Sequence, residues 1–240
     1  MEDHSEVRSV DKGLLWLCQL DPVIAYLASK YGTPTLSRAS LSDFGFDPSP
    51  LGLSQEQRFF ADLVDIVIHQ QLAGKAASAI SNRVREVVGG VLSSGSILKA
   101  EPDLLRLAGL SQAKVRAITE LSGAVESGAL RLGSFAAMSD DEVSLHLGKY
   151  RGFGPWSSQM FLMFSLGRLD IWPIGDLGVR KGFRHSYRLE HLPNPKQMID
   201  YGDRFKPYRS LVAWYMWKSL AEEMPGHLFQ GRQALRLDIL

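Results

Sequence analysis

The sequence predicts an all-α protein, and three observations support that fold class. Apolar residues recur at helical spacing in several segments, helix-starting signals precede these segments, and no alternating stretch is long enough for a confident strand. The chain has 240 residues, 45% of them hydrophobic and 22% charged, which is the composition of an ordinary globular protein. Helices joined by short loops favour antiparallel neighbours in a bundle-like array.

The first clear helix begins at Asp21-Pro22 and stops at Gly32. Aspartate is a good N-cap, proline fits the first helical position, and glycine ends helices well. Residues 33–53 are rich in Pro, Gly, Ser and Asp, and this composition predicts a connector.

Ser54 and Gln57 form a capping box for the next helix, whose apolar face begins at Phe59. Later signals predict further helices over residues 75–88, 102–107, 111–120, 139–147, 179–187 and 208–223. Ser139 and Glu142 make a second capping box within this series.

Residues 148–181, GKYRGFGPWSSQMFLMFSLGRLDIWPIGDLGVRK, are the most informative stretch. Gly152 and Gly154 stand between two predicted helices, where glycine permits a tight turn. Pro155 suits the first position of the helix that follows. A helix N-terminus attracts an anion such as phosphate through its N–H groups and its dipole. The turn therefore predicts a phosphate contact, although a Gly-x-Gly pattern alone is a weak signal.

Asp176 follows this helix across a loop and has apolar neighbours without an adjacent basic residue. A carboxylate in that setting is either a helix N-cap or a group with a functional role.

The net charge of the chain is +1, so only a local basic surface favours a polyanionic partner, and a solvated helix face is the alternative. The basic residues of this region are Lys149, Arg151, Arg168, Arg180, Lys181, Arg184 and Arg188.

Two further motifs carry polar or aromatic side chains between or along helices. Gln70-Gln71-Leu72 joins two predicted helices, and at least one glutamine is expected to face solvent or a ligand because burying both is costly. Gln70 could instead satisfy the ends of the flanking helices. Trp156 opens a helix beside the turn, and Trp217 ends an aromatic run in the last predicted helix. Core packing is the alternative for such tryptophans.

Taken in order, these motifs resemble the helix-hairpin-helix DNA glycosylase superfamily, and best its 3-methyladenine DNA glycosylase II (AlkA-like) branch. The branch pattern Gly-x-Gly-x-Trp reads here as residues 152–156, and Pro-x-x-Asp-Leu-Gly-Val-Arg reads as residues 173–180. The resemblance extends roughly from Phe59 to Leu220. Many relatives have a second Asp where this chain has Gly175, which leaves Asp176 as the only carboxylate for the catalytic role.

The resemblance implies a role for each of these motifs. Asp176 would be the catalytic residue, and the flipped base would enter a pocket walled by Trp156 and Trp217, with Met160 lining it. Gln71, or else Leu72, would fill the gap that the base leaves. The remaining expected DNA contacts are Lys149, Arg151, Gly152, Phe153, Gly154 and Ser157. A monovalent cation, sodium or potassium, is expected on the carbonyls of Gly148, Tyr150 and Gly152.

The implied fold is two helical subdomains flanking a cleft for DNA and the base, within one glycosylase unit. Approximately residues 54–180 would form the central subdomain, with the hairpin at 145–167. Approximately residues 1–53 and 181–240 would form the second.

The implied activity is hydrolysis of the N-glycosidic bond of alkylated purines, of the 3-methyladenine and 7-methylguanine type, in base excision repair. A glycosylase for deaminated or oxidised bases is one alternative, and a non-catalytic helix-hairpin-helix module is another. An unrelated all-α interaction protein is the third. The lysine nucleophile of bifunctional relatives would occupy the position of Trp156, so lyase activity is not expected. Electron-rich rings suit a cationic alkylated base.

The partner expected from this resemblance is double-stranded DNA containing alkylated bases. The protein is expected to bind it as a monomer, and no membrane partner is expected.

Cys18 is the only cysteine, so neither an intramolecular disulfide nor a four-cysteine iron–sulfur cluster can form. No cofactor is expected beyond the cation. The N-terminus MEDHSEVRSVDKG lacks the pattern of a signal peptide, which predicts an intracellular protein, in the cytoplasm or nucleoid of a bacterium or the nucleus of a eukaryote.

Overall fold

The structure, a computed structural model, describes residues 9–36, 52–72, 74–221 and 223–229. Every regular element within these ranges is a helix, which confirms the all-α prediction. The chain divides into two compact units, one formed by Met1–Leu36 with Arg168–Leu240 and one formed by Ser37–Gly167. No helix among the described residues combines the length and hydropathy needed to cross a membrane.

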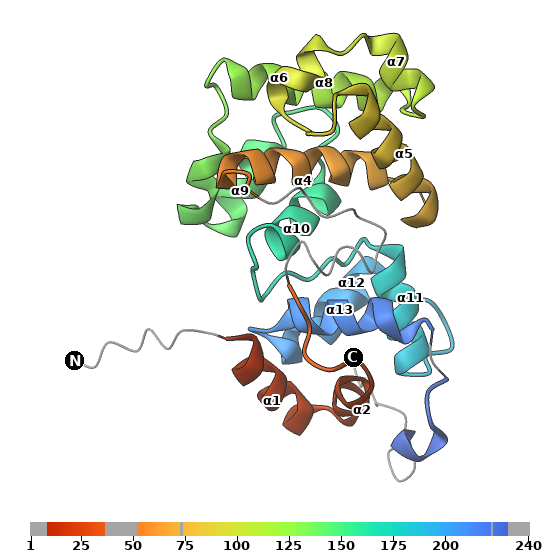
Figure 1. The fold of residues 1–240 in the computed structure, drawn as a ribbon. Helices are drawn as coiled ribbons and strands as arrows, with labels where there is room; N and C mark the ends of the chain where they lie inside the picture. Colours follow the sequence, from red (N-terminus) through yellow and green to blue (C-terminus); the bar gives the residue numbers. More distant parts are fainter. Residues whose placement is uncertain (1–8, 37–51, 73, 222, 230–240) are drawn as a thin grey trace, which may run out of the picture. The chain divides into compact units, whose positions relative to one another are not determined.

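The unit Ser37–Gly167 is built around helix α4 (Figure 1). Its helices are α4 (Gln55–His69), α5 (Gly74–Val87), α6 (Ser94–Lys99), α7 (Pro102–Leu107), α8 (Gln112–Glu126), η2 (Leu132–Ala137), α9 (Asp140–Leu147) and α10 (Pro155–Phe164). Every residue of α4 from Phe59 to His69 is buried, because α5, α8, η2 and α10 all pack against it. A buried central helix of this kind gives rigid support to the turn that follows it, which contains Gln70, Gln71 and Leu72.

Two acidic side chains of α4, Asp62 and Asp65, are buried in this core, and that of Asp65 has both a hydrogen-bond donor and a charged partner. The carboxylate of Asp65, on α4, accepts a hydrogen bond from the Ser81 hydroxyl at 2.7 Å and forms an ion pair with Arg85 at 2.7 Å. Burying a carboxylate is costly unless it gains such partners. The pair therefore ties α5 to the middle of α4.

The other unit contains the N-terminal helices and the C-terminal third of the chain. Its helices are α1 (Val10–Leu20), α2 (Pro22–Tyr31), α11 (Leu177–Ser186), α12 (Pro195–Gly202), η3 (Asp203–Phe205), α13 (Arg209–Ser219) and η4 (Gly226–Phe229). Helices α11 and α13 form its main packing contact, and α1 and α2 cover α13. Helix α13 is the core of this unit, with every residue from Ser210 to Met216 buried.

Local capping signals correctly predicted several helix starts. Asp21 caps α2 by accepting from the N–H groups of Val23 and Ile24 at 2.9 and 3.2 Å. The capping box of Ser54 and Gln57 is formed at the start of α4. Among the α-helices of the described residues, three were not predicted, namely α1, α6 and α12. For α12 the signal was present, because Asn194 and Gln197 form a capping box there.

The remaining boundaries differ from the predictions in instructive ways. Helix α8 continues to Glu126, beyond the predicted end at residue 120. Two predictions concern segments that lie largely outside the described residues. One is the connector 33–53, and the other is the intracellular location inferred from residues 1–13. The division between the units falls at residue 167 rather than near residue 180. The contacts of the loop that begins at Arg168 explain this difference.

Candidate functional site

Asp176 is the N-cap of helix α11 and lies half-buried. Its Oδ1 atom accepts a hydrogen bond from the backbone N–H of Val179 at 2.7 Å. The same oxygen accepts a second hydrogen bond from the indole Nε1–H of Trp217 at 2.9 Å. Hydrogen bonds to an ionised carboxylate are stronger than those between neutral groups. The N-cap, one of the two alternatives that the sequence offered for Asp176, is therefore formed, and its carboxylate also binds an indole.

Two glycines of α11 bring Trp217 close enough to reach Asp176. A Cβ atom on Gly178 would lie 2.7 Å from Cδ1 of Trp217 and 3.1 Å from Oδ1 of Asp176. A Cβ atom on Gly182 would overlap the backbone carbonyl of Met216. Only glycine permits backbones to approach this closely. The packing of α11 on α13 thus fixes the distance between carboxylate and indole.

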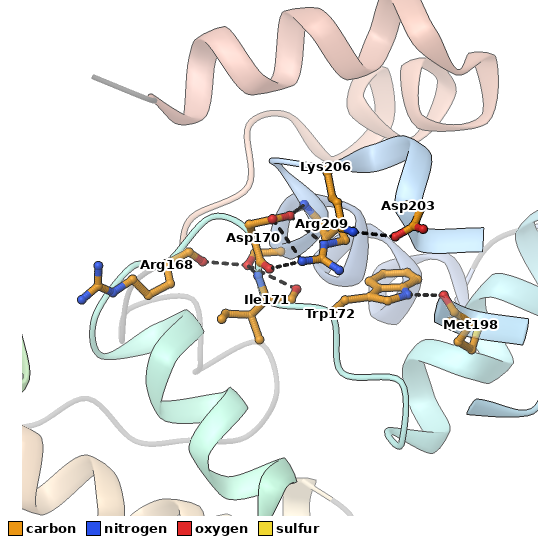
Figure 2. Close-up of polar contacts among 9 residues, drawn as sticks. Arg168, Asp170, Ile171, Trp172, Met198, Asp203, Lys206 and Arg209 are labelled. Carbon is orange, nitrogen blue, oxygen red and sulfur yellow. Dashed lines mark hydrogen bonds and ion pairs between the residues drawn. The ribbon is translucent and has the colours of Figure 1, made fainter. Parts of the chain in front are cut away.

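The loop that leads to Asp176 is anchored to the start of α13, as Figure 2 shows. The guanidinium of Arg209 binds the carboxylate of Asp170 in two places, with Nε–Oδ1 at 2.7 Å and Nη2–Oδ2 at 3.0 Å. Bidentate geometry of this kind fixes orientation as well as distance. The Ser210 hydroxyl donates to the Arg168 carbonyl at 2.7 Å and accepts from the Ile171 N–H at 2.9 Å. These bonds make the loop part of the unit formed by Met1–Leu36 and Arg168–Leu240, which is called the C-terminal unit below.

Trp172 completes this support from the other side. Its indole Nε1–H donates to the carbonyl of Met198 at 2.5 Å, and its ring packs against Gly202, where a Cβ atom would clash. The side chain is 5% exposed, so it serves packing. Pro173 follows directly, and its carbonyl accepts from the Asp176 N–H at 2.9 Å. The position of Asp176 is therefore determined from both ends of the loop.

The hairpin was predicted at residues 145–167, and its connecting loop, called the hairpin below, is residues 148–154 between α9 and α10. Gly152 has a φ of 85°, and a Cβ atom there would lie 2.9 Å from Cβ of Ala117 on α8. Gly154 is the N-cap of α10 and gives that helix no side-chain cap. Lys149 and Arg151 are exposed beside it. Arg151 lies 3.8 Å from Glu120, an exposed pair of little energetic weight.

Two residues predicted to contact DNA have buried side chains, namely Phe153 at 3% and Ser157 at 2% exposure. The Ser157 hydroxyl accepts a hydrogen bond from Nε2 of Gln70 at 2.8 Å and lies 3.4 Å from the Gly152 carbonyl, to which it donates. A DNA contact by either residue would have to come from its backbone.

Two of the three carbonyls expected to hold a monovalent cation, those of Tyr150 and Gly152, accept hydrogen bonds within the protein. The Gly152 carbonyl accepts from Nε2 of Gln70 at 2.6 Å and from the Ser157 hydroxyl at 3.4 Å. The Tyr150 carbonyl accepts from the Phe153 N–H at 3.3 Å. A carbonyl oxygen has two lone pairs, and those of Gly152 are both engaged. The cation therefore stays an expectation from the resemblance, and no step of the reaction proposed below depends on it.

Gln71 and Leu72, the predicted wedge residues, are exposed at the C-terminal end of α4. Gln71 has a φ of 60°, which a residue with a side chain seldom adopts. The side chain of Gln70 points to the hairpin through its bonds to Gly152 and Ser157. The two adjacent glutamines therefore divide the tasks, one binding the hairpin and the other remaining accessible.

Sequence reasoning missed Lys114, on the first turn of α8. Its Nζ atom donates to the carbonyls of Ile68 at 2.7 Å and Gln70 at 2.8 Å. Partial burial lowers the pKa of Lys114 from its ordinary value. The available signal was its position, because a lysine three residues after the N-cap Ser111 opposes the helix dipole. A lysine at that position is expected to have its stabilising partners outside its own helix.

The predicted pocket residues are divided between the two units. Asp176 and Trp217 lie in the C-terminal unit and are brought together. Trp156 and Met160 lie one turn apart on α10 in the other unit, half-buried and 4% exposed respectively. The turn with Gln71, the hairpin and α8 meet within that same unit.

Comparison with known proteins gives one family and a consistent set of relatives. The model of the HhH-GPD superfamily base excision DNA repair proteins matches residues 64–207. DNA-3-methyladenine glycosylase 1 of Schizosaccharomyces pombe is 31% identical over 163 residues, 67% of this chain and 72% of that protein.

Solved structures agree with the sequence comparison. The S. pombe 3-methyladenine DNA glycosylase Mag1, in complex with abasic DNA, aligns with a TM-score of 0.73 and 27% identity, covering 86% of this chain and 95% of that chain. A DNA-3-methyladenine glycosidase from Bacillus halodurans aligns with a TM-score of 0.68 and 30% identity, covering 93% and 96%. The matched family range includes the turn, the hairpin and Asp176.

Proposed function

The chain belongs to the HhH-GPD superfamily of base excision DNA repair proteins, and on that premise we propose that it is a monofunctional DNA glycosylase that releases alkylated purines by hydrolysis. The observation that carries this proposal is Asp176, held by the N–H groups of Val179 and Trp217 at the start of α11. Its relatives named as 3-methyladenine DNA glycosylases support the substrate class.

Asp176 would act on the sugar. The bond between C1′ of the deoxyribose and the ring nitrogen of the base breaks, and its electron pair leaves with the base. That pair neutralises the alkylated base and leaves the sugar as an oxocarbenium cation. The carboxylate of Asp176 stabilises this cation as it forms, a role that carboxylates have in glycoside hydrolysis generally. Water then adds to C1′ and loses a proton, which leaves an abasic site.

The carboxylate is suited to this task because it is positioned before the reaction begins. Two N–H donors fix Oδ1 at 2.7 and 2.9 Å, so little reorganisation is needed when positive charge develops nearby. Preorganised charge in a site that excludes water is commonly the largest contribution to catalysis. The anchored loop from Arg168 to Asp176 serves the same end.

The tryptophans would recognise the charge of the damaged base. A cation over an indole face gains roughly 0.5–2 kcal/mol, depending on desolvation. Trp217 donates its N–H to the carboxylate of Asp176, so the ring is held while its face stays aromatic and electron-rich. Trp156 would supply a second aromatic face, and Met160, one turn later on α10, would line the pocket, as the resemblance implies. A base that already carries positive charge leaves without protonation, so neither a general acid nor a cofactor is required.

The unit Ser37–Gly167 would hold the DNA. The N-terminus of α10, which Gly154 leaves without a side-chain cap, would bind a backbone phosphate. The exposed side chains of Lys149 and Arg151 would add charge-dependent affinity. Gln71, with Leu72 beside it, would fill the gap in the base stack. We propose that a monomer does this on double-stranded DNA.

Lyase activity would require an amine nucleophile beside the sugar. The position of that nucleophile in bifunctional relatives corresponds to Trp156 here, and an indole cannot form a Schiff base. We therefore propose that the enzyme stops at the abasic site and leaves the DNA backbone intact.

Product analysis on methylated duplex DNA tests the proposal. We expect 3-methyladenine and 7-methylguanine to be released, and the DNA strand to break only after alkali is added. A duplex with hypoxanthine or 8-oxoguanine is the matched comparison and should be processed more slowly. Release of oxidised or deaminated bases alone would overturn the substrate class, and strand breaks without alkali would overturn the monofunctional assignment.

A further inference from the structure

The segment His69–Leu72 forms a type II β-turn in which Gln71 occupies the strained position. The Leu72 N–H donates to the His69 carbonyl at 3.2 Å, Gln70 has φ −54° and ψ 127°, and Gln71 has φ 60°. These are the features of a type II turn, whose third residue needs a positive φ and is ordinarily Gly or Asn. A glutamine there costs about 1–2 kcal/mol of backbone strain, so something in the fold must hold it.

The carbonyl of Gln70 decides which turn the segment adopts. Type I and type II turns differ by a flip of the peptide plane between the two central residues, and here that plane carries the Gln70 carbonyl. The same carbonyl accepts a hydrogen bond from Lys114 Nζ at 2.8 Å, while Nζ also donates to the Ile68 carbonyl at 2.7 Å. After a flip to type I, the Gln70 carbonyl would point away from Nζ.

We propose that Lys114 is a positioning residue that holds the turn in its type II form and thereby sets the direction in which Gln71 leaves the backbone. This inference rests on the proposed function in one respect, namely that Gln71 enters the base stack. Without the lysine contact, Gln71 can relax to a negative φ, and its side chain then projects from a different face of the turn.

A second contact ties the same residue to the hairpin. Nε2 of Gln70 donates to the Gly152 carbonyl at 2.6 Å and to the Ser157 hydroxyl at 2.8 Å. Gln70 is thus held through its carbonyl by α8 and through its side chain by the hairpin. Lys114 and Ala117 lie three residues apart on α8, and Ala117 contacts the hairpin at Gly152. Helix α8 is therefore a common support for the wedge and the phosphate-binding turn.

The location of Lys114 suits this role better than a role in α8 itself. A cation on the first turn of a helix opposes that helix's dipole, whereas near the last carbonyls of another helix it is favourable. Ile68 and Gln70 are at the C-terminal end of α4, where carbonyls lack partners within the helix. Lys114 satisfies two of them at once, one in the helix and one in the turn.

A double-mutant cycle between Lys114 and Gln71 tests the proposal. The variants are Lys114→Met, Gln71→Ala and the combination, each compared with the wild type. One readout is single-turnover release of 7-methylguanine. The other is the fluorescence of 2-aminopurine placed beside a tetrahydrofuran abasic analogue, which reports insertion into the stack without any chemistry. If Lys114 acts through Gln71, the Lys114→Met change should lower the rate of base release and the insertion signal about 10-fold when Gln71 is present. In the Gln71→Ala background the same change should lower them less than about two-fold.

Equal losses in the two backgrounds, or no loss from Gln71→Ala itself, would overturn the proposal. Lys114→Arg keeps the donors and should recover most of the signal. Lys99→Met, the same change at an exposed lysine of α6, is the control and should have no effect.

Should Lys114→Met fail to fold, Gln70→Glu replaces the donating amide with an acceptor and should show the same dependence on Gln71. A protein that releases no alkylated base would refute the proposed function, while the fluorescence cycle on the abasic duplex would still decide the role of Lys114.

Discussion

Helices α10 and α11 both begin in the segment that carries the candidate site, and their N-termini are completed in different ways. At α11 the protein supplies the anion, because Asp176 accepts from the N–H of Val179 at 2.7 Å. At α10 the N-cap is Gly154, which has no side chain to accept from the first N–H groups of the helix. The same partial positive charge thus fixes a carboxylate in one case and is left for a ligand in the other. Under the proposed function, the N-terminus of α11 would serve the chemistry and that of α10 would bind a phosphate.

Asp176→Asn should break the first half of this comparison with the largest effect. Asparagine is as good an N-cap as aspartate, so the helix should stay intact while the charge is lost. We expect single-turnover base release to fall about 10²- to 10³-fold, as for other preorganised groups, with DNA affinity nearly unchanged. Base release would be followed by chromatography of free bases and affinity by fluorescence anisotropy.

Asp21→Asn is the matched control for that variant. Asp21 is also a helix N-cap, and it forms an ion pair with Arg204 at 2.6 Å. Its loss should lower the melting temperature and leave release per folded molecule unchanged. If Asp176→Asn behaved like Asp21→Asn, the carboxylate would be structural only.

Gly178→Ala tests whether the contact of Trp217 with Asp176 matters for the chemistry. The added Cβ would lie 2.7 Å from the Trp217 ring and 3.1 Å from Oδ1 of Asp176, so the indole must move. We expect release to fall about 10-fold, with a loss of stability of about 1–3 kcal/mol from overpacking. Release would be measured at a temperature well below the melting transition.

Gly175→Ala is the matched control, because a Cβ there meets nothing within 4 Å. It should match the wild type in both release and melting temperature. Equal behaviour of the two alanine variants would mean that the indole contact with Asp176 has no catalytic importance.

Gly154→Asp converts the open N-terminus of α10 into a copy of that of α11. A Cβ at this position meets nothing within 4 Å, and the backbone is extended with φ −89° and ψ −174°, so a new cap can form. We expect a small gain in stability of a few tenths of a kcal/mol and a loss of DNA affinity of about 10-fold, since the carboxylate takes the N–H groups and repels phosphate. Gly154→Asn caps without charge and should lose less. Unchanged affinity in both variants would show that phosphate does not bind at this helix.

The parts of this site that are local in sequence could be predicted, and the parts that join distant segments could not. Capping boxes lie within four residues of the helix they start, so α4 and α9 were found from their residues alone. Asp176 was singled out for a similar reason, because its polar character stands out from its apolar neighbours. Its bond to Trp217 spans 41 residues, and only the resemblance suggested that both belong to one site.

Lys114 shows the limit most clearly. Its carbonyl partners lie 46 and 44 residues away, and no periodic pattern encodes such contacts. The sequence holds only the indirect sign of a cation at an unfavourable helix position. The hairpin was predicted as a turn, but the hydrogen bond from Gln70 to the Gly152 carbonyl joins residues 82 positions apart, and no local pattern shows it.

Exchange of sodium for potassium is the last and smallest test of the comparison between the two N-termini. If the hairpin bound phosphate through a cation on its carbonyls, affinity would depend on which ion is present. The Gly152 carbonyl already accepts two hydrogen bonds, at 2.6 and 3.4 Å, so we expect the N-terminus of α10 to carry the contact. At constant ionic strength, replacing sodium by potassium or by tetramethylammonium should change the anisotropy-derived dissociation constant less than about two-fold, while raising total salt should weaken binding steeply. Gln70→Ala frees the carbonyl and is the informative variant, because a cation preference that appears only there would show that the Gln70 amide stands where a metal ion otherwise could.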